Sequence, residues 1–274
     1  MRRKTFGKTG REASEIGVGT YYDPLWIATA FMGWRRGAAK KVEAIGAGLE
    51  AGITLVDTAE AYGSEPLVAE AIRGRKRDKF FVATKAWSNH LRRDALKRSL
   101  EKSLKRLGVS YVDLYQVHFP NKRVPISETM AAMEDFVRAG KILHVGVSNF
   151  SLQQIQEANA ALPKSQLSSV QLPYNLMNRA VEKEILPYCV RERIAFIAYF
   201  PLAHGKLVSN QRLAAVCAKY GKTASQLALR WLARKDGVFP IPRASEPGHV
   251  AEDAAASGWD LTDEDAMQLE RLFS

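Results

Sequence analysis

The chain has 274 residues, 46% hydrophobic and 25% charged, which suits one large globular domain, and no apolar run approaches the roughly 18 residues of a membrane span. The basic N-terminus leads into no apolar core of a signal peptide, and Cys189 and Cys217 lie in no metal-binding spacing, so we expect a cytoplasmic protein without a metal site. The net charge of +11 suggests nucleic acid as a partner. However, the densest basic run, residues 92–106, has leucines at helical spacing, so we interpret it as the solvated face of a helix and expect no nucleic-acid binding.

Short apolar runs alternate with helical periods along the chain. Turn residues between Phe6 and Gly10 predict an N-terminal hairpin that leads into a first strand near residues 16–20. Residues 21–37 are predicted to form a long loop. The further predicted strands are 53–56, 80–84, 111–117, 142–147, 169–172, 194–199 and 238–241. The predicted helices are 38–51, 65–73, 92–106, 127–139, 151–161, 180–192, 210–219 and 223–235, with one or two in the tail, where Thr262 is a plausible N-cap.

Eight β–α units in succession, without a linker of Pro, Ser or Gly, predict one parallel α/β domain over residues 1–274. Eight units favour a closed (β/α)8 TIM barrel over an open doubly wound sheet. The first strand is also not followed by the GxGxxG turn of an open dinucleotide-binding sheet.

Polar residues close the predicted strands, and in a barrel these strand ends meet on one rim. Singly, each could be structural: Asp57 could cap a helix, Lys85 could be a surface charge and His118 a core histidine. Their recurrence at successive strand ends favours a functional site. The set comprises Asp57, Lys85, His118, Ser148, Asn149, Gln171, Tyr199 and Arg243.

Tyr62, in the loop after the second strand, adds a proton donor to this set. A phenol has a pKa near 10, and we expect the Lys85 ammonium to lower it by about one to three units. Asp57 would neutralise Lys85, and His118 could donate a hydrogen bond to a carbonyl oxygen. A proton donor and an oxyanion site without a nucleophile indicate carbonyl reduction, with hydride from a cofactor.

The sequence resembles the aldo-keto reductases along nearly its whole length. The motifs that carry the resemblance are Asp57-Thr-Ala with Tyr62-Gly-Ser-Glu65, Ala83-Thr-Lys85, Asp113-Leu-Tyr-Gln-Val-His118, Gly146-Val-Ser-Asn-Phe150, Val170-Gln-Leu-Pro-Tyr-Asn175, Tyr199-Phe-Pro-Leu202 and Ile241-Pro-Arg-Ala-Ser245.

The resemblance implies a barrel that binds NAD(P)H in extended form, with Tyr62 as general acid, Asp57 and Lys85 tuning it, and His118 orienting the carbonyl. It implies that Ser148, Asn149 and Gln171 hold the nicotinamide carboxamide and that Tyr199 stacks on the ring. Pro201 to Leu207 would pass along the pyrophosphate and Arg243 to Asp253 would hold the adenosine. The full implied cofactor set is Gly19, Thr20, Tyr21, Asp57, Ser148, Asn149, Gln171, Tyr199, Phe200, Pro201, Leu202, Gly205, Leu207, Ile241, Pro242, Arg243, Ala244, Ser245, His249, Glu252 and Asp253.

Four residues of the implied cofactor set depart from the family pattern. Phe200 replaces a frequent Ser after the stacking Tyr, and Ala244 replaces a frequent hydroxyl residue. His249 replaces an Arg that many members carry for the adenine and 2′-phosphate, and Asp253 replaces a common Asn. Arg243 remains and can pair with a phosphate bidentately, so we expect NADPH, with NADH possible as the alternative.

Aromatic residues near the strand ends are expected to wall the substrate pocket: Tyr22, Trp26, Trp87 and Phe119. An alternative is that Trp26 and Trp34 pin their loop. Because the chain ends soon after its last helix, we expect no long closing loop and an open, apolar pocket for varied aldehydes and ketones. The rival function is a cofactor-sensing regulatory subunit with slow turnover, as in the potassium-channel β-subunits of this family; the sequence leaves the oligomeric state open.

Overall fold

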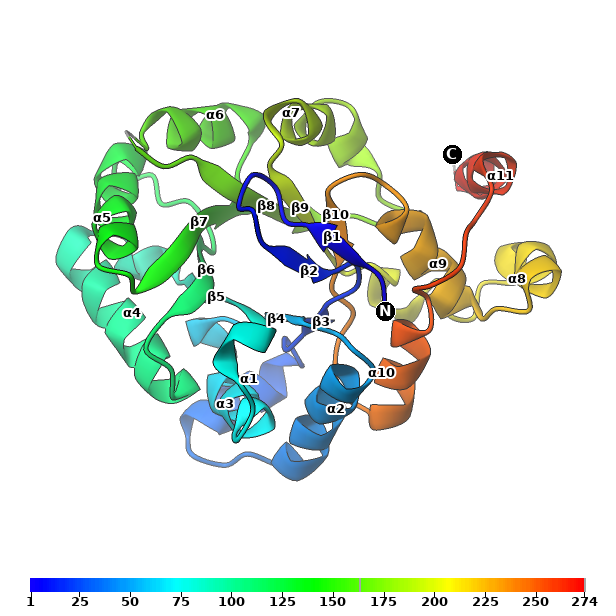
Figure 1. Ribbon diagram of the computed structural model, residues 1–274, viewed down its shortest axis with the longest axis horizontal. Helices are drawn as coiled ribbons and strands as arrows, with labels where there is room; N and C mark the ends of the chain where they lie inside the picture. Colours follow the sequence, from blue (N-terminus) through cyan, green and yellow to red (C-terminus); the bar gives the residue numbers. More distant parts are fainter. Residues whose placement is uncertain (163, 274) are drawn as a thin grey trace.

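The computed structural model describes residues 1–162 and 164–273. Eight parallel strands form one sheet in which each strand pairs with its neighbours in chain order. Gly19 N–H donates to the Pro242 carbonyl (2.7 Å) and Ala244 N–H to the Gly19 carbonyl (2.9 Å), so the first and last strands meet and the barrel closes (Figure 1). The predicted (β/α)8 barrel is confirmed. The strands are β3 (Val18–Gly19), β4 (Leu55–Asp57), β5 (Phe81–Ala86), β6 (Val112–Val117), β7 (Ile142–Ser148), β8 (Leu167–Pro173), β9 (Ala195–Tyr199) and β10 (Val238–Pro240).

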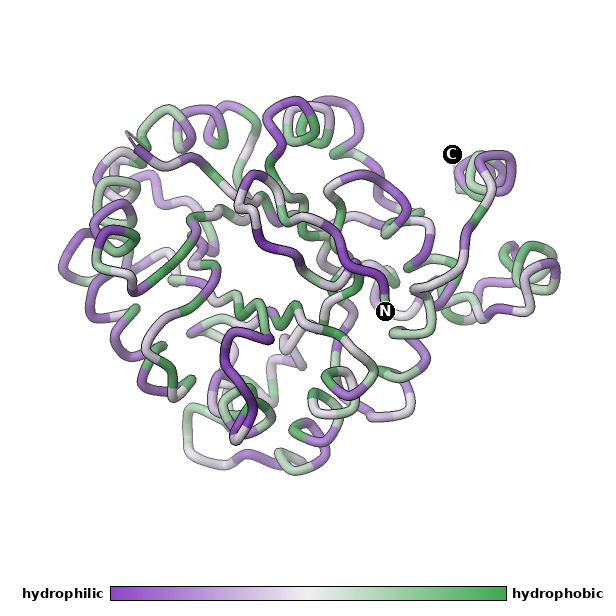
Figure 2. The backbone as a smooth tube through the Cα atoms, in the orientation of Figure 1, coloured by the Kyte–Doolittle hydropathy of each residue, from purple (hydrophilic) through white to green (hydrophobic). Residues whose placement is uncertain are grey.

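Most helices surround the ring of strands, whereas α8 and α11 lie outside this layer at the right of Figure 1. Along the helical turns the tube alternates between hydrophobic and hydrophilic colours (Figure 2), as expected for amphipathic helices on a barrel. Within the described residues, no helix is both long and apolar enough to cross a membrane. The helices are α1 (Pro24–Phe31), α2 (Ala38–Glu50), α3 (Glu65–Ile72), α4 (Arg93–Leu107), α5 (Ile126–Arg138), α6 (Leu152–Ala160), α7 (Ile185–Glu192), α8 (Ala214–Tyr220), α9 (Ala224–Ala233), α10 (Pro247–Ala254) and α11 (Asp263–Leu272).

Helix α4 contains the densest basic run of the sequence. Its buried side chains include Leu96, Leu100 and Leu104, whereas its basic residues other than Arg106 are exposed. The interpretation of residues 92–106 as an amphipathic helix is confirmed. Thr262 is also confirmed as the N-cap of α11, where its side chain accepts the backbone N–H of Asp265.

The predicted N-terminal hairpin, β1 (Arg3–Thr5) and β2 (Glu12–Ser14), crosses the N-terminal end of the barrel (Figure 1). The ring of Phe6 lies 4.3 Å from that of Phe81 and 4.9 Å from that of Phe239, so this side chain plugs the barrel floor. The opposite end, where the strands terminate, is therefore the end available for a site.

Two element predictions were wrong. The predicted loop 21–37 contains helix α1, which starts with Asp23 as N-cap, accepting the Trp26 N–H at 2.8 Å, and with Pro24 in its first turn. The predicted helix 180–192 is a 3-10 turn (Ala180–Glu182) followed by α7. Pro187 explains this break, because proline lacks the N–H and its ring clashes with the carbonyl four residues earlier.

Candidate functional site

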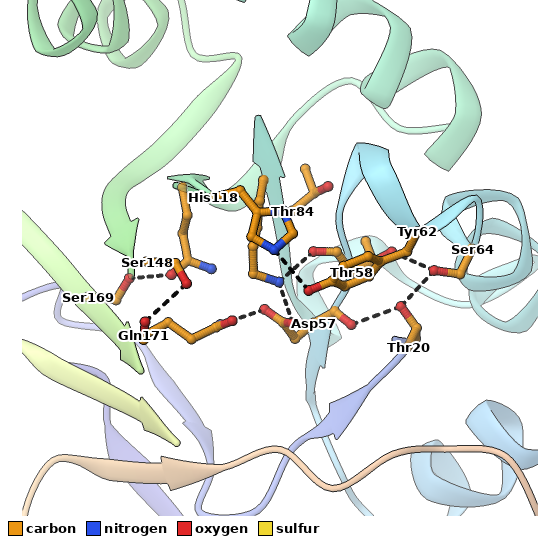
Figure 3. A network of polar contacts seen from close by, with 12 residues as sticks. Thr20, Asp57, Thr58, Tyr62, Ser64, Thr84, His118, Ser148, Ser169 and Gln171 are labelled. Atoms are coloured by element: carbon orange, nitrogen blue, oxygen red, sulfur yellow. Dashed lines mark hydrogen bonds and ion pairs between the residues drawn. The ribbon is translucent and has the colours of Figure 1, made fainter. Parts of the chain in front are cut away.

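Asp57 (labelled in Figure 3) and Lys85 form a buried ion pair at the C-terminal ends of β4 and β5. Lys85 Nζ donates to Asp57 Oδ1 at 2.5 Å and to the Thr58 carbonyl at 2.9 Å. The other carboxylate oxygen of Asp57 accepts from Gln171 Nε2 at 2.9 Å. The side chains of Lys85 and Asp57 are 0% and 3% exposed, so each charge depends on these partners, because a buried unpaired charge is costly.

Tyr62 lies above this pair, in a 3-10 turn (Glu60–Tyr62) that follows β4. Its hydroxyl is 3.2 Å from Nε2 of His118, which follows β6, and Lys85 Nζ is 5.0 Å from the centre of its ring (Figure 3). The structure thus brings together the four residues predicted as the catalytic set, from three neighbouring strand ends. A phenol, an imidazole and an ammonium converge where a substrate oxygen could accept a proton.

Burial determines the charge state of these groups. It raises the pKa of Tyr62 well above its usual value, and the nearby Asp57 carboxylate adds to the rise. Burial and the Lys85 charge lower the pKa of His118 to about 3. Burial also lowers the pKa of Lys85, although Asp57 opposes this. The expected lowering of the Tyr62 pKa is therefore not seen, because burial and the Asp57 carboxylate both raise that pKa. At neutral pH, Tyr62 is a protonated phenol and His118 a neutral imidazole.

The neutral His118 can donate with one ring nitrogen and accept with the other. Its Nδ1 is buried and has no hydrogen-bond partner among residues 1–162 and 164–273. The Phe119 ring stacks 4.9 Å from the His118 ring, at an interplanar angle of 22°. The ring is therefore held by packing, with Nε2 facing the Tyr62 hydroxyl.

Amide and hydroxyl groups gather at the neighbouring ends of β7 to β9. Ser148 Oγ donates to the Gln171 carbonyl at 3.0 Å, and Asn149 Nδ2 donates to the His118 carbonyl at 2.9 Å. Tyr199 OH donates to Asn149 Oδ1 at 2.8 Å. Asn149 has a φ of +61°, a conformation that non-glycine residues adopt rarely and often at functional sites. Such a donor–acceptor set beside a half-buried phenol ring fits a planar carboxamide.

The segment after β9 has an unusual backbone. Phe200, Ala203 and His204 all have positive φ, at +50°, +50° and +56°. The Phe200 ring lies 4.9 Å from that of Tyr199 and 6.2 Å from that of Tyr21, which itself lies 5.2 Å from Tyr62. These contacts place the predicted pyrophosphate segment beside the Tyr62 site.

The predicted adenosine-binding residues extend from β10 into α10. Arg243 Nη1 donates to the Tyr22 carbonyl at 3.2 Å, which leaves the exposed guanidinium near the first strand. His249 is exposed in the first turn of α10. Asp253 is buried, and burial together with Glu252 raises its pKa to about 8. Glu252 Oε1 accepts a hydrogen bond from Thr223 at 2.6 Å.

Comparisons with known proteins decide the family. The model of the aldo/keto reductase family matches residues 24–273. The chain belongs to the aldo/keto reductase family. It is 34% identical to aldo-keto reductase YhdN of Bacillus subtilis (strain 168), covering 100% of this chain and 94% of the relative. It is 32% identical to methylglyoxal reductase YeaE of Escherichia coli (strain K12), covering 94% of this chain and 90% of the relative.

A solved aldo/keto reductase from Klebsiella pneumoniae, in complex with NADP and acetate, superposes with a TM-score of 0.88 at 33% identity. The match covers 100% of this chain and 96% of that one. This chain is therefore an NAD(P)H-dependent oxidoreductase, of a family that acts on small carbonyl compounds.

The residues expected to wall the substrate pocket of this aldo/keto reductase lie in two places. The Trp87 ring stands edge-on to the rings of His118 (5.1 Å) and Phe119 (5.4 Å). Tyr22 and Trp26 are instead 3% and 4% exposed and pack against each other, with Trp26 Nε1 donating to the Tyr62 carbonyl at 3.2 Å. That contact matches the alternative in which Trp26 pins its segment.

The other residue of that alternative, Trp34, is 66% exposed, so it contributes little to holding residues 21–37 in place.

Sequence reasoning missed two groups of contacts around the site, although it had placed Thr20 in the implied cofactor set. One is a hydroxyl cluster in which Ser64 Oγ lies 2.9 Å from Thr20 Oγ1 and 3.1 Å from Thr58 Oγ1 (Figure 3). The other is a pair of carboxylates, the buried Glu65 and the partly buried Glu60. Glu65 accepts from Thr84 Oγ1 at 2.7 Å and Arg106 Nε at 2.5 Å. The sequence signal was two acidic residues that flank Tyr62, but nothing in their spacing reveals partners this distant in the chain.

Proposed function

We propose that this aldo/keto reductase reduces aldehydes and ketones to alcohols, preferentially with NADPH, and that Tyr62 delivers the proton. The observation that carries the proposal is the 3.2 Å contact between the Tyr62 hydroxyl and His118 Nε2, next to the buried Lys85–Asp57 pair.

The four catalytic residues have separate tasks in this proposal. A carbonyl oxygen placed between Tyr62 and His118 can accept a hydrogen bond from each, which stabilises the charge that develops on it. Tyr62 then transfers its proton to that oxygen. The transient phenolate is stabilised by the Lys85 ammonium, 5.0 Å from the ring centre. The neutral phenol of the resting state is stabilised less by this charge, so the interaction favours proton transfer. Asp57 keeps Lys85 charged and in place.

The nicotinamide cofactor, when bound, supplies the hydride. Ser148, Asn149 and Gln171 would hold its carboxamide, and the Tyr199 ring would cover its face. Asn149 and Gln171 already bridge to His118 and Asp57, so the cofactor and proton-transfer residues belong to one hydrogen-bonded network. Arg243, with its exposed guanidinium, would bind the phosphate of NADPH, which supports NADPH over NADH.

A relative named as a methylglyoxal reductase, 32% identical, supports a 2-oxoaldehyde as a substrate. The aromatic rings of Trp87 and Phe119 beside His118 support aromatic aldehydes as well. The test is the rate of NADPH and NADH oxidation with methylglyoxal, aromatic aldehydes, ketones and sugars. We expect carbonyl-dependent oxidation, faster with NADPH. Tight cofactor binding with negligible turnover of every carbonyl would instead support a regulatory role.

A further inference from the structure

We propose that Glu60 is a positioning residue that fixes Trp87 beside His118 and thereby sets the affinity for substrates that contact this wall. The inference rests on the proposed function, because it assigns the pocket wall of that same site.

The Glu60 carboxylate joins three parts of the chain. Its Oε1 accepts the backbone N–H of Trp87 and lies 2.9 Å from Nδ1 of His90. Its Oε2 accepts from Ser99 Oγ on α4 at 2.5 Å. Only 9% of the side chain is exposed. A carboxylate this buried is costly unless its oxygens are satisfied, so these contacts hold the connected segments in one arrangement.

The segment that carries Trp87 is held from two sides. Glu60 precedes Tyr62 by two residues and holds the Trp87 N–H. On the other side Asn121, three residues after His118, donates from Nδ2 to the Ser88 carbonyl at 2.8 Å. The Trp87 segment is therefore tied to both of the loops that carry the proposed proton donor and its partner.

The position of Trp87 affects the shape of the pocket beside His118. Its ring stands at 85° to the His118 ring and at 75° to the Phe119 ring, so a shift of its backbone changes the space beside His118. Tyr62 shares a turn with Glu60 but has contacts that do not involve it, since its carbonyl accepts from Trp26 and its hydroxyl faces His118. Loss of the Glu60 contacts should thus loosen the wall and leave proton transfer intact.

The first test observes Trp87 directly. The protein is labelled with 5-fluorotryptophan, and the Trp87 signal among the five tryptophans is assigned in the fluorine NMR spectrum with Trp87→Phe. We expect this signal to shift or broaden in Glu60→Ala and less in Glu60→Gln, whose amide oxygen can still accept the Trp87 N–H. Glu70→Ala is the matched control, because Glu70 is an exposed glutamate on α3.

The second test measures the KM and kcat of the same variants with NADPH, using 4-nitrobenzaldehyde as the probe that reaches the wall and methylglyoxal as the small probe. For Glu60→Ala we expect the KM for 4-nitrobenzaldehyde to rise about tenfold, with kcat within about twofold of wild type. The KM for methylglyoxal should rise less, and Glu70→Ala should match wild type.

An unchanged Trp87 signal in Glu60→Ala, or a lower melting temperature with both KM values unchanged, would show that Glu60 only stabilises the fold and would overturn the proposal. If Glu60→Ala does not fold, Glu60→Gln and Ser99→Ala decide in its place, with smaller changes expected in the same direction. If wild type does not oxidise NADPH in the presence of any carbonyl compound tested, the proposed function fails. The NMR test still decides whether Glu60 positions Trp87.

Discussion

The Tyr62 hydroxyl lies 3.2 Å from Nε2 of His118, while burial keeps the first a protonated phenol and the second a neutral imidazole. The pair can therefore present two uncharged hydrogen-bond donors to one substrate oxygen. Lys85, paired with Asp57 beneath them, adds a positive charge that is not itself aimed at the substrate. The site is built to bind an oxygen that gains negative charge.

The buried Lys85–Asp57 pair should dominate the local stability. Lys85→Met and Asp57→Asn each leave a buried charge without its partner, so we expect each to lower the free energy of unfolding by about 3–5 kcal/mol. The double variant should lose less than the sum. The exposed Lys40–Glu246 pair is the control, and Lys40→Met should cost no more than about 1 kcal/mol. Denaturant unfolding measures all four, and additive losses at residues 57 and 85 would contradict the coupling.

The pH dependence of turnover should lack a histidine ionisation near pH 6.5. Burial lowers the pKa of His118 to about 3 and raises that of Tyr62 well above its usual value, so neither changes charge between about pH 5 and 8. We expect kcat/KM to be nearly flat across this range. An inflection near pH 6.5 that disappears in His118→Asn would mean that His118 titrates in the site.

His118 should also contribute to acid sensitivity of the fold. Unfolded histidine has a pKa near 6.5, against about 3 in the folded protein, so between these values the unfolded chain binds the additional proton. The contribution of neutral His118 to the free energy of unfolding is therefore fully present above pH 6.5 and is lost as the pH falls toward 3. We expect His118→Gln to lose less stability than wild type between pH 6.5 and 4, as measured by urea unfolding. His249→Gln, an exposed histidine change, should follow the wild-type curve.

Arg243 should discriminate between the two cofactors. Its guanidinium is exposed and can pair with a 2′-phosphate, so Arg243→Ala should weaken NADPH binding about tenfold or more and NADH binding much less. Fluorescence titration of the purified protein with each cofactor measures this. Arg73→Ala, which removes an exposed cation just after α3, is the control. Equal weakening of NADPH and NADH binding would show that Arg243 contacts a part of the cofactor that the two molecules share.

The sequence predicted those features that follow from a repeated pattern. Asp57, Lys85 and His118 each close an apolar run, and parallel strands bring such residues to one rim. Helix α1 was missed because its start signal, Asp23-Pro24, lies among aromatic residues without clear periodicity.

Side-chain environment was less accessible to sequence reasoning. The pKa of Tyr62 depends on how much water the fold excludes, which no residue spacing reports. The partners of Glu60 lie as far as Ser99 along the chain, so its role required the three-dimensional arrangement.

The most direct test of the central claim is carbonyl-dependent NADPH oxidation by wild type and Tyr62→Phe, measured beside NADPH binding by both. Removal of one hydroxyl should lower kcat by about 10²- to 10⁴-fold, while cofactor affinity changes little. Tyr111→Phe, the same chemical change at the opposite end of β6, should retain wild-type turnover. Undiminished turnover in Tyr62→Phe would contradict the account, because the proton would then come from another group.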